Sequence, residues 1–120
     1  METSQFPGAL KRLGGDKELF RELAVYFIED APELLRAIRA GLVEGNAEDI
    51  RRAAHSLRGL AANFDAEQAV AIAGSIENMC GKGELQLVPV ALTRLEVEVH
   101  ALWDVLQKQA AHPSPATRHE

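Results

Sequence analysis

His55 is the residue of this chain best suited to chemistry, because it lies on the polar side of a segment with helical periodicity. Apolar residues recur at helical spacing between positions 50 and 64. At about 100° per residue, His55 falls roughly 160° from the centre of this stripe. The stripe consists of Ile50, Ala53, Ala54, Leu57, Ala61 and Phe64. The imidazole is therefore predicted to face solvent, where a neutral ring nitrogen can act as a nucleophile.

The residues within two turns of His55 on its outer face are either cationic or small. Gly59 stands in the interior of the predicted helix, where glycine costs about 0.5–1 kcal/mol relative to alanine, and Ala62 follows it. The cations within one turn are Arg51, Arg52 and Arg58. A phosphoryl group on the ring would add about two negative charges, which guanidinium groups can stabilise. The pattern indicates a phosphoryl acceptor with room beside it for another protein.

The segment from Ala54 to Ala66 resembles the signature of histidine-containing phosphotransfer (HPt) domains, which usually reads His-x-Leu-Lys-Gly followed by small residues. The resemblance continues upstream in Leu13 to Leu19 and Phe27 to Pro32, and downstream at Ile76-Glu77. It covers about residues 8 to 108. The chain is most similar to the C-terminal HPt modules of bacterial hybrid sensor kinases.

The resemblance implies a phosphorelay carrier rather than a kinase. His55 would accept a phosphoryl group from the aspartate of a receiver domain and pass it to another receiver domain. Arg58 would stabilise the phosphate, and Gly59 would give clearance for the partner. No cofactor is expected in this chain, since the partner receiver domain would bring Mg²⁺. The binding residues expected around this centre are Arg51, Arg52, Ala62 and Glu77, of which Glu77 would either orient the imidazole or be a solvated helix carboxylate.

Two departures from the HPt pattern bear on the site. Arg58 replaces the usual lysine, which keeps the charge but exchanges a compact ammonium for a planar fork. Asp65 stands where the family commonly has glycine. Asp65 with Gln68 three residues later predicts a capping box for the next helix.

The hydrophobic pattern predicts an all-α fold, an antiparallel four-helix bundle with a short extra N-terminal helix. We expect a short helix at 8–13, then one long helix that Asp16 caps, that Pro32 kinks and that closes at Gly41 and Gly45. Its apolar stripe comprises Phe20, Leu23, Phe27, Ala31, Leu34, Ile38 and Leu42. Asn46 is predicted to cap the helix that carries His55.

The His55 helix is expected at 47–64 and the next at 65–80. A last helix, with Pro89 in its first turn, follows the breaker at 81–83. We expect residues 1–7 to form an N-terminal arm, 8–109 the HPt-like bundle, and 110–120 a flexible tail.

Composition limits the other functions of the chain. A net charge of −5 disfavours binding to nucleic acid or anionic membrane, and no apolar run approaches the length of a membrane span. The single cysteine, Cys80, excludes an intramolecular disulfide and predicts a small core residue on a stripe with Ile72, Ile76 and Met79. No metal site is expected, and His112 and His119 are assigned to the tail. We expect a cytoplasmic monomer.

Two other classes of function compete with the carrier. The dimerisation and phosphoacceptor domain of a sensor kinase typically has an acidic residue directly after its histidine and a proline soon after. Here Ser56 follows His55, and no proline occurs before Pro89. The second alternative is a helical structural or dimerisation module that keeps the fold without phosphotransfer, and the sequence leaves it open.

Overall fold

The computed structural model describes residues 6–111, and these residues form helices joined by short turns. The predicted all-α class is confirmed. None of the described helices is long and apolar enough to span a membrane. The elements are α1 (Pro7–Arg12), α2 (Lys17–Glu44), α3 (Ala47–Ala62), α4 (Glu67–Gly81), the 3-10 turn η1 (Leu85–Leu87) and α5 (Val88–Ala111). Residues 1–5 of the predicted arm and 112–120 of the predicted tail, with His112 and His119, lie outside the described residues.

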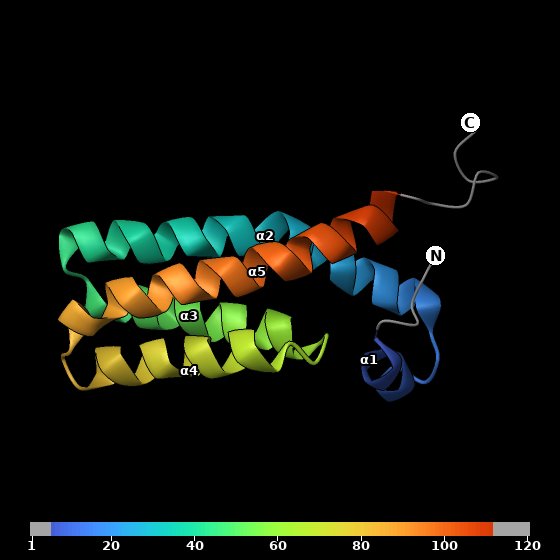
Figure 1. Cartoon of the computed structure of the whole chain (residues 1–120), viewed down its shortest axis with the longest axis horizontal. Coiled ribbons are helices and arrows are strands. Elements are labelled where there is room, and N and C mark those ends of the chain that lie inside the picture. Colours follow the sequence, from blue (N-terminus) through green and yellow to red (C-terminus); the bar gives the residue numbers. More distant parts are fainter. Residues whose placement is uncertain (1–5, 112–120) are drawn as a thin grey trace.

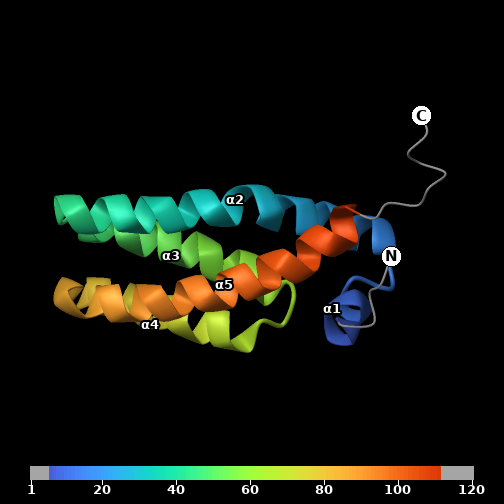
Figure 2. The same cartoon turned by 45° about the horizontal axis from the view of Figure 1, so that its top comes forward.

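The four long helices form an antiparallel bundle, as predicted (Figure 1). Helix α3 packs between α2 and α4, and α5 closes the bundle against both of these helices. Helix α5 therefore lies diagonally across from α3 (Figure 2). The short helix α1 lies at the end of the bundle where α2 begins. This arrangement leaves the outer face of α3 uncovered between α2 and α4.

The helix boundaries follow from side-chain caps and left-handed turns. Asp16 accepts a hydrogen bond from the backbone N–H of Leu19 at 3.0 Å, and Asn46 accepts one from that of Asp49 at 3.0 Å. Both predicted N-caps are confirmed. Gly45 ends α2 with φ of 69°, a left-handed conformation that glycine adopts without strain.

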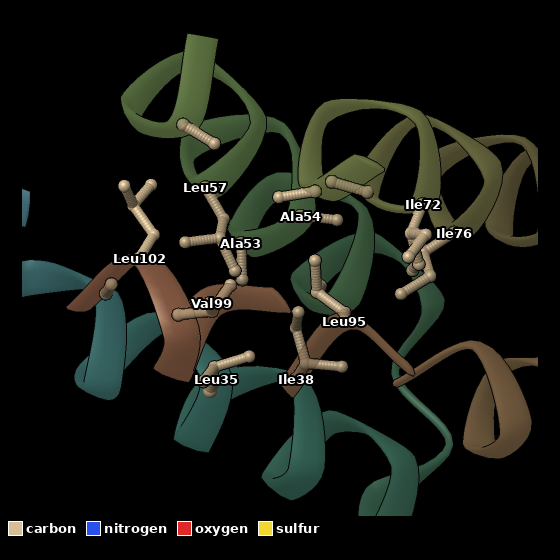
Figure 3. Packing of buried hydrophobic residues seen from close by; sticks show 14 of the residues in the cluster. Leu35, Ile38, Ala53, Ala54, Leu57, Ile72, Ile76, Leu95, Val99 and Leu102 are labelled. Carbon is tan, nitrogen blue, oxygen red and sulfur yellow. The ribbon is translucent and has the colours of Figure 1, made fainter. Parts of the chain in front are cut away.

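The core is built from the predicted apolar stripes, which meet at the centre of the bundle (Figure 3). Every residue of the predicted stripe from Ile50 to Phe64 is buried. On α5 the helically spaced apolar residues Val88, Leu92, Leu95, Val99, Leu102 and Leu106 are buried as well. Cys80 is buried as predicted, and burial raises the pKa of its thiol. Three residues of the predicted α2 stripe, Leu23, Leu34 and Leu42, are only partly buried, because the buried line of α2 runs through Ala24, Leu35 and Gly41 instead. Leu34 is instead free to line the groove between α2 and α3. Met79 on α4 is also only partly buried.

Gly41 does not close α2, contrary to the expectation, because the helix continues to Glu44. The residue is buried against α3, and a Cβ atom placed on it would lie 2.6 Å from Cγ1 of Ile50. Glycine is therefore needed here for the close approach of α2 to α3, the helix that carries His55.

The predicted capping box of Asp65 and Gln68 is wrong. Helix α4 begins at Glu67, and its N-cap residue, Ala66, makes no side-chain cap. Asp65 adopts φ of 55°, a left-handed conformation that suits the glycine usual at this place and that aspartate tolerates. Its carboxylate is turned toward α1, where it accepts a hydrogen bond from Arg12 at 2.7 Å.

Pro32 lies inside α2, which continues through it as a single helix. Because proline has no N–H, the carbonyl of Ile28 one turn earlier has no partner within the helix. The indole N–H of Trp103 on α5 donates to this carbonyl at 3.0 Å. In Figure 1 the N-terminal part of α2 lies at an angle to the rest. A side chain from α5 thus compensates for the hydrogen bond that Pro32 removes.

We expect Trp103→Phe to lower the free energy of unfolding by about 1–2 kcal/mol, because it leaves the Ile28 carbonyl without its donor. Urea denaturation followed by circular dichroism measures this loss, since Trp103 is the single tryptophan and its removal abolishes the usual fluorescence signal. In a Pro32→Ala background the restored backbone N–H of residue 32 should donate to the Ile28 carbonyl. Trp103→Phe should then lower the free energy of unfolding by less. An equal loss in free energy of unfolding with Pro32 and with Pro32→Ala would contradict this account.

Candidate functional site

His55 lies in the second half of α3, and its side chain is 61% exposed. Its neighbours Ala54 and Leu57 are fully buried in the core, so the helix presents the imidazole to the opposite side. The prediction that the ring faces solvent is confirmed. The face it occupies is the strip of α3 that neither α2 nor α4 covers.

Glu77 on α4 and Arg58 on α3 surround the Nδ1 atom of His55. Oε1 of Glu77 lies 3.1 Å from this nitrogen, and a terminal nitrogen of Arg58 lies at the same distance. The second oxygen of Glu77 forms an ion pair with Nε of Arg58 at 2.7 Å. The Glu77 side chain is only 15% exposed, so the carboxylate is held between the helices rather than solvated.

The two neighbours of Nδ1 require different protonation states of this nitrogen. Glu77 accepts a hydrogen bond if Nδ1 carries the proton, whereas Arg58 can donate to Nδ1 only if that nitrogen is unprotonated. Arg58 is already paired with the carboxylate, so we assign the Nδ1–H tautomer with Glu77 as acceptor. In this tautomer the lone pair is on Nε2, for which no hydrogen-bond partner is found among residues 6–111.

The surface after His55 on α3 is open. A Cβ atom built on Gly59 meets nothing within 4 Å, so no contact inside the described chain explains a glycine in this helix. Ala62 is exposed one turn further on, near α1. Gly74 on α4 lies under the aliphatic part of Arg58, where a Cβ would be 3.7 Å from Cδ. The site therefore has little side-chain bulk on the C-terminal side of the ring.

Arg51 and Arg52 are not brought to the ring. Arg51 donates two hydrogen bonds to Glu48, at 3.1 and 2.6 Å, and these bonds lower the pKa of the Glu48 carboxyl. Arg52 lies 3.7 Å from Asp49 and 3.9 Å from Glu48. Of the three predicted cations, only Arg58 contacts His55 in this structure.

A groove of about 540 Å³ borders His55 on its α2 side. Its lining was not foreseen from the sequence, because periodicity places a residue on a helix face without showing which helix lies opposite. Ser56 lines this groove together with the imidazole. The remaining lining residues are Asp30, Glu33, Leu34, Gly59 and Leu60.

Groups of three or more His, Cys, Asp or Glu side chains that could hold a metal ion are not found among the residues that the structure describes. The charged groups at the site, Glu77 and Arg58, are paired with each other and with the imidazole. The arrangement presents an exposed imidazole with a carboxylate and a cation at Nδ1, and with open space on the C-terminal side of the ring.

A search of curated proteins finds no match to this chain. Among solved structures, the fold is similar to the crystal structure of histidine-containing phosphotransfer protein B from Pseudomonas aeruginosa PAO1, with a TM-score of 0.79 and 22% sequence identity. The match covers 94% of this chain and 96% of that chain. At this identity the likeness establishes the fold alone.

The family model of the Hpt domain matches residues 22–106, which include His55, Arg58, Gly59 and Glu77. Hpt domains carry phosphoryl groups in phosphorelays, where they work with response-regulator receiver domains. The match covers well over half of the chain and all four helices of the bundle. This chain belongs to the Hpt domain family and is a histidine phosphotransfer carrier.

Proposed function

We propose that Nε2 of His55 accepts a phosphoryl group from the phosphoaspartate of a receiver domain and later yields it to the aspartate of another. The observation that carries this proposal is the exposed imidazole whose Nδ1 lies 3.1 Å from a largely buried carboxylate. A carboxylate at Nδ1 keeps the proton on that nitrogen and the lone pair on Nε2, which faces away from it. The ring is therefore oriented and in the nucleophilic form before a donor arrives.

The transfer exchanges one bond for another. The Nε2 lone pair attacks the phosphorus of the acyl phosphate, an N–P bond forms, and the bond from phosphorus to the aspartate oxygen breaks. The aspartate leaves as a carboxylate with the bonding electron pair. The imidazole then carries a positive charge, which the Glu77 carboxylate stabilises through the Nδ1–H bond. The reverse sequence returns the group to a second receiver.

Arg58 is proposed to stabilise the phosphoryl group, because its guanidinium reaches the ring and has donors beyond those that face Glu77. Arg51 and Arg52 would contribute to the positive field only after leaving Glu48 and Asp49. We therefore propose that Arg58 is the main cation that stabilises the phosphate, and that Arg51 and Arg52 help to attract the partner.

Gly59 and Ala62 are proposed to give the receiver room to reach Nε2, which agrees with the empty space beside Gly59. The receiver would bring the Mg²⁺ that helps to neutralise the transferring group. We propose that the chain acts as a monomer in the cytoplasm, with a hybrid sensor kinase as one source of the phosphorylated receiver, and without kinase activity of its own.

His55→Gln should abolish labelling of the chain by a ³²P-phosphorylated receiver, because glutamine offers no nucleophilic ring nitrogen. The label on the wild type should be lost in acid and kept in base, as phosphohistidine requires. His100→Gln is the matched control, since His100 is exposed on α5, and it should label like the wild type. Label retained in His55→Gln would assign the acceptor to another residue. Absence of label in the wild type would favour the alternative, a helical structural module without phosphotransfer.

Glu77→Ala should slow transfer about tenfold, which corresponds to about 1.4 kcal/mol of transition-state stabilisation. Glu77→Gln should be milder, because its amide oxygen can still accept from Nδ1. The ¹⁵N chemical shifts of the His55 ring should show the Nδ1–H tautomer in the wild type and a mixture in Glu77→Ala. Glu67→Ala on the same helix is the control, and unchanged shifts in Glu77→Ala would show that Glu77 does not position the ring.

Gly59→Gln should slow labelling by the receiver at least tenfold while it raises helix stability by about 0.5–1 kcal/mol. The built Cβ meets nothing in the described chain, so the fold should be kept. Labelling by phosphoramidate, a small donor that needs no docking, should change little. Ala101→Gln, at an exposed position of α5, is the control for added side-chain volume. An unchanged rate of labelling by the receiver in Gly59→Gln would contradict the proposal that Gly59 gives the receiver room.

A further inference from the structure

We propose that Asp30 and Glu33, on the α2 rim of the groove beside His55, select receiver domains that carry lysine or arginine on the surface bordering the phosphorylation pocket. This inference rests on the proposed function and adds to it a rule for partner choice. It starts from the groove itself, which places two carboxylates of α2 around the same hollow as His55, Ser56 and Gly59.

The groove is continuous with the reactive centre. His55 and Gly59 are both part of its lining, and its apolar surface comes from Leu34 and Leu60, which are only partly buried. A second hollow between α2 and α3 shares Leu34 and Ser56 with it and extends it away from Gly59. A donor whose phosphoaspartate reaches Nε2 must therefore cover part of this surface.

The charges on the two sides of His55 are opposite in sign. On the α4 side the ring meets Arg58, whose carboxylate partner Glu77 is mostly buried. On the α2 side the groove is lined by Asp30 and Glu33 and by no cation. Glu33 is paired with Arg36 on its own helix, whereas no ion pair or hydrogen bond of the Asp30 side chain is found among residues 6–111.

This asymmetry determines how a charged partner can approach. The phosphorylation pocket of a receiver is acidic, so Asp30 would repel it, and Glu33 would contribute less because Arg36 pairs with it. The pocket would therefore sit on the Arg58 side of His55. The part of the receiver that then covers the α2 rim gains if it is basic and loses if it is acidic, because like charges brought together disfavour the wrong partner. Rim charges of this kind act mainly on the association rate and are weakened by salt.

The test uses a phosphorylated receiver that labels the wild-type chain, together with a variant of that receiver. In the variant, lysines and arginines on the surface bordering the pocket, and none inside the pocket, are changed to glutamate. At low salt, Asp30→Lys should slow labelling by the first receiver at least tenfold and speed labelling by the reversed receiver by a similar factor. Both effects should shrink toward twofold in 0.5 M salt. Asp104→Lys makes the same charge change on exposed α5 and should alter neither rate by more than twofold.

Phosphoramidate labelling separates the two proposals. If it labels His55 equally in the wild type and in Asp30→Lys, the acceptor is intact and any change with the receivers reports docking. Equal receiver rates for Asp30→Lys and Asp104→Lys, with normal labelling of His55, would overturn the selection rule alone. Failure of every donor to label His55 in the wild type would overturn the proposed function and the rule with it.

Discussion

The contact between Glu77 and Nδ1 of His55 is the interaction on which the site depends, because it links the reactive residue of α3 to α4. A histidine on an isolated helix would rotate about its side-chain bonds and exchange between tautomers. Here the carboxylate is held between the helices and bonds one ring nitrogen, so the other nitrogen is directed outward with its lone pair. We therefore propose that the packing of α3 against α4 both buries an apolar stripe and determines which ring nitrogen can react.

That packing follows from elements that the sequence predicts well. The apolar stripes of α3 and α5 are buried as their spacing indicates, and Asp16 and Asn46 cap the helices they were expected to cap. Such features depend on residues close in sequence, for which helical periodicity and capping are sufficient. The same logic placed His55 opposite the stripe and identified Gly59 as a glycine that the core does not need.

Contacts between residues far apart in the sequence could not be predicted from helical periodicity and capping. Asp65 lies next to a segment that looks like a capping box, yet its left-handed backbone and its bond to Arg12 on α1 give it another role. Trp103 compensates for Pro32 from 71 positions away, and the sequence offers no sign of this. The acidic rim at Asp30 has the same origin, because the partner face of α2 is known only when the bundle is assembled.

A carrier must bind its phosphoryl group well enough to receive it and loosely enough to lose it. In the proposed mechanism Arg58 would favour the phosphorylated state, but its charge is shared with Glu77 in this structure, so its full attraction would be available only after that ion pair loosens. Glu77 would stabilise the imidazolium through Nδ1 and, as an anion, would oppose a phosphate held on the other nitrogen. In this proposal the cation and the carboxylate act against each other at one ring. Such an opposed pair would keep the free energies of the phosphorylated and unphosphorylated states close, so that the docked receiver would decide the direction of transfer.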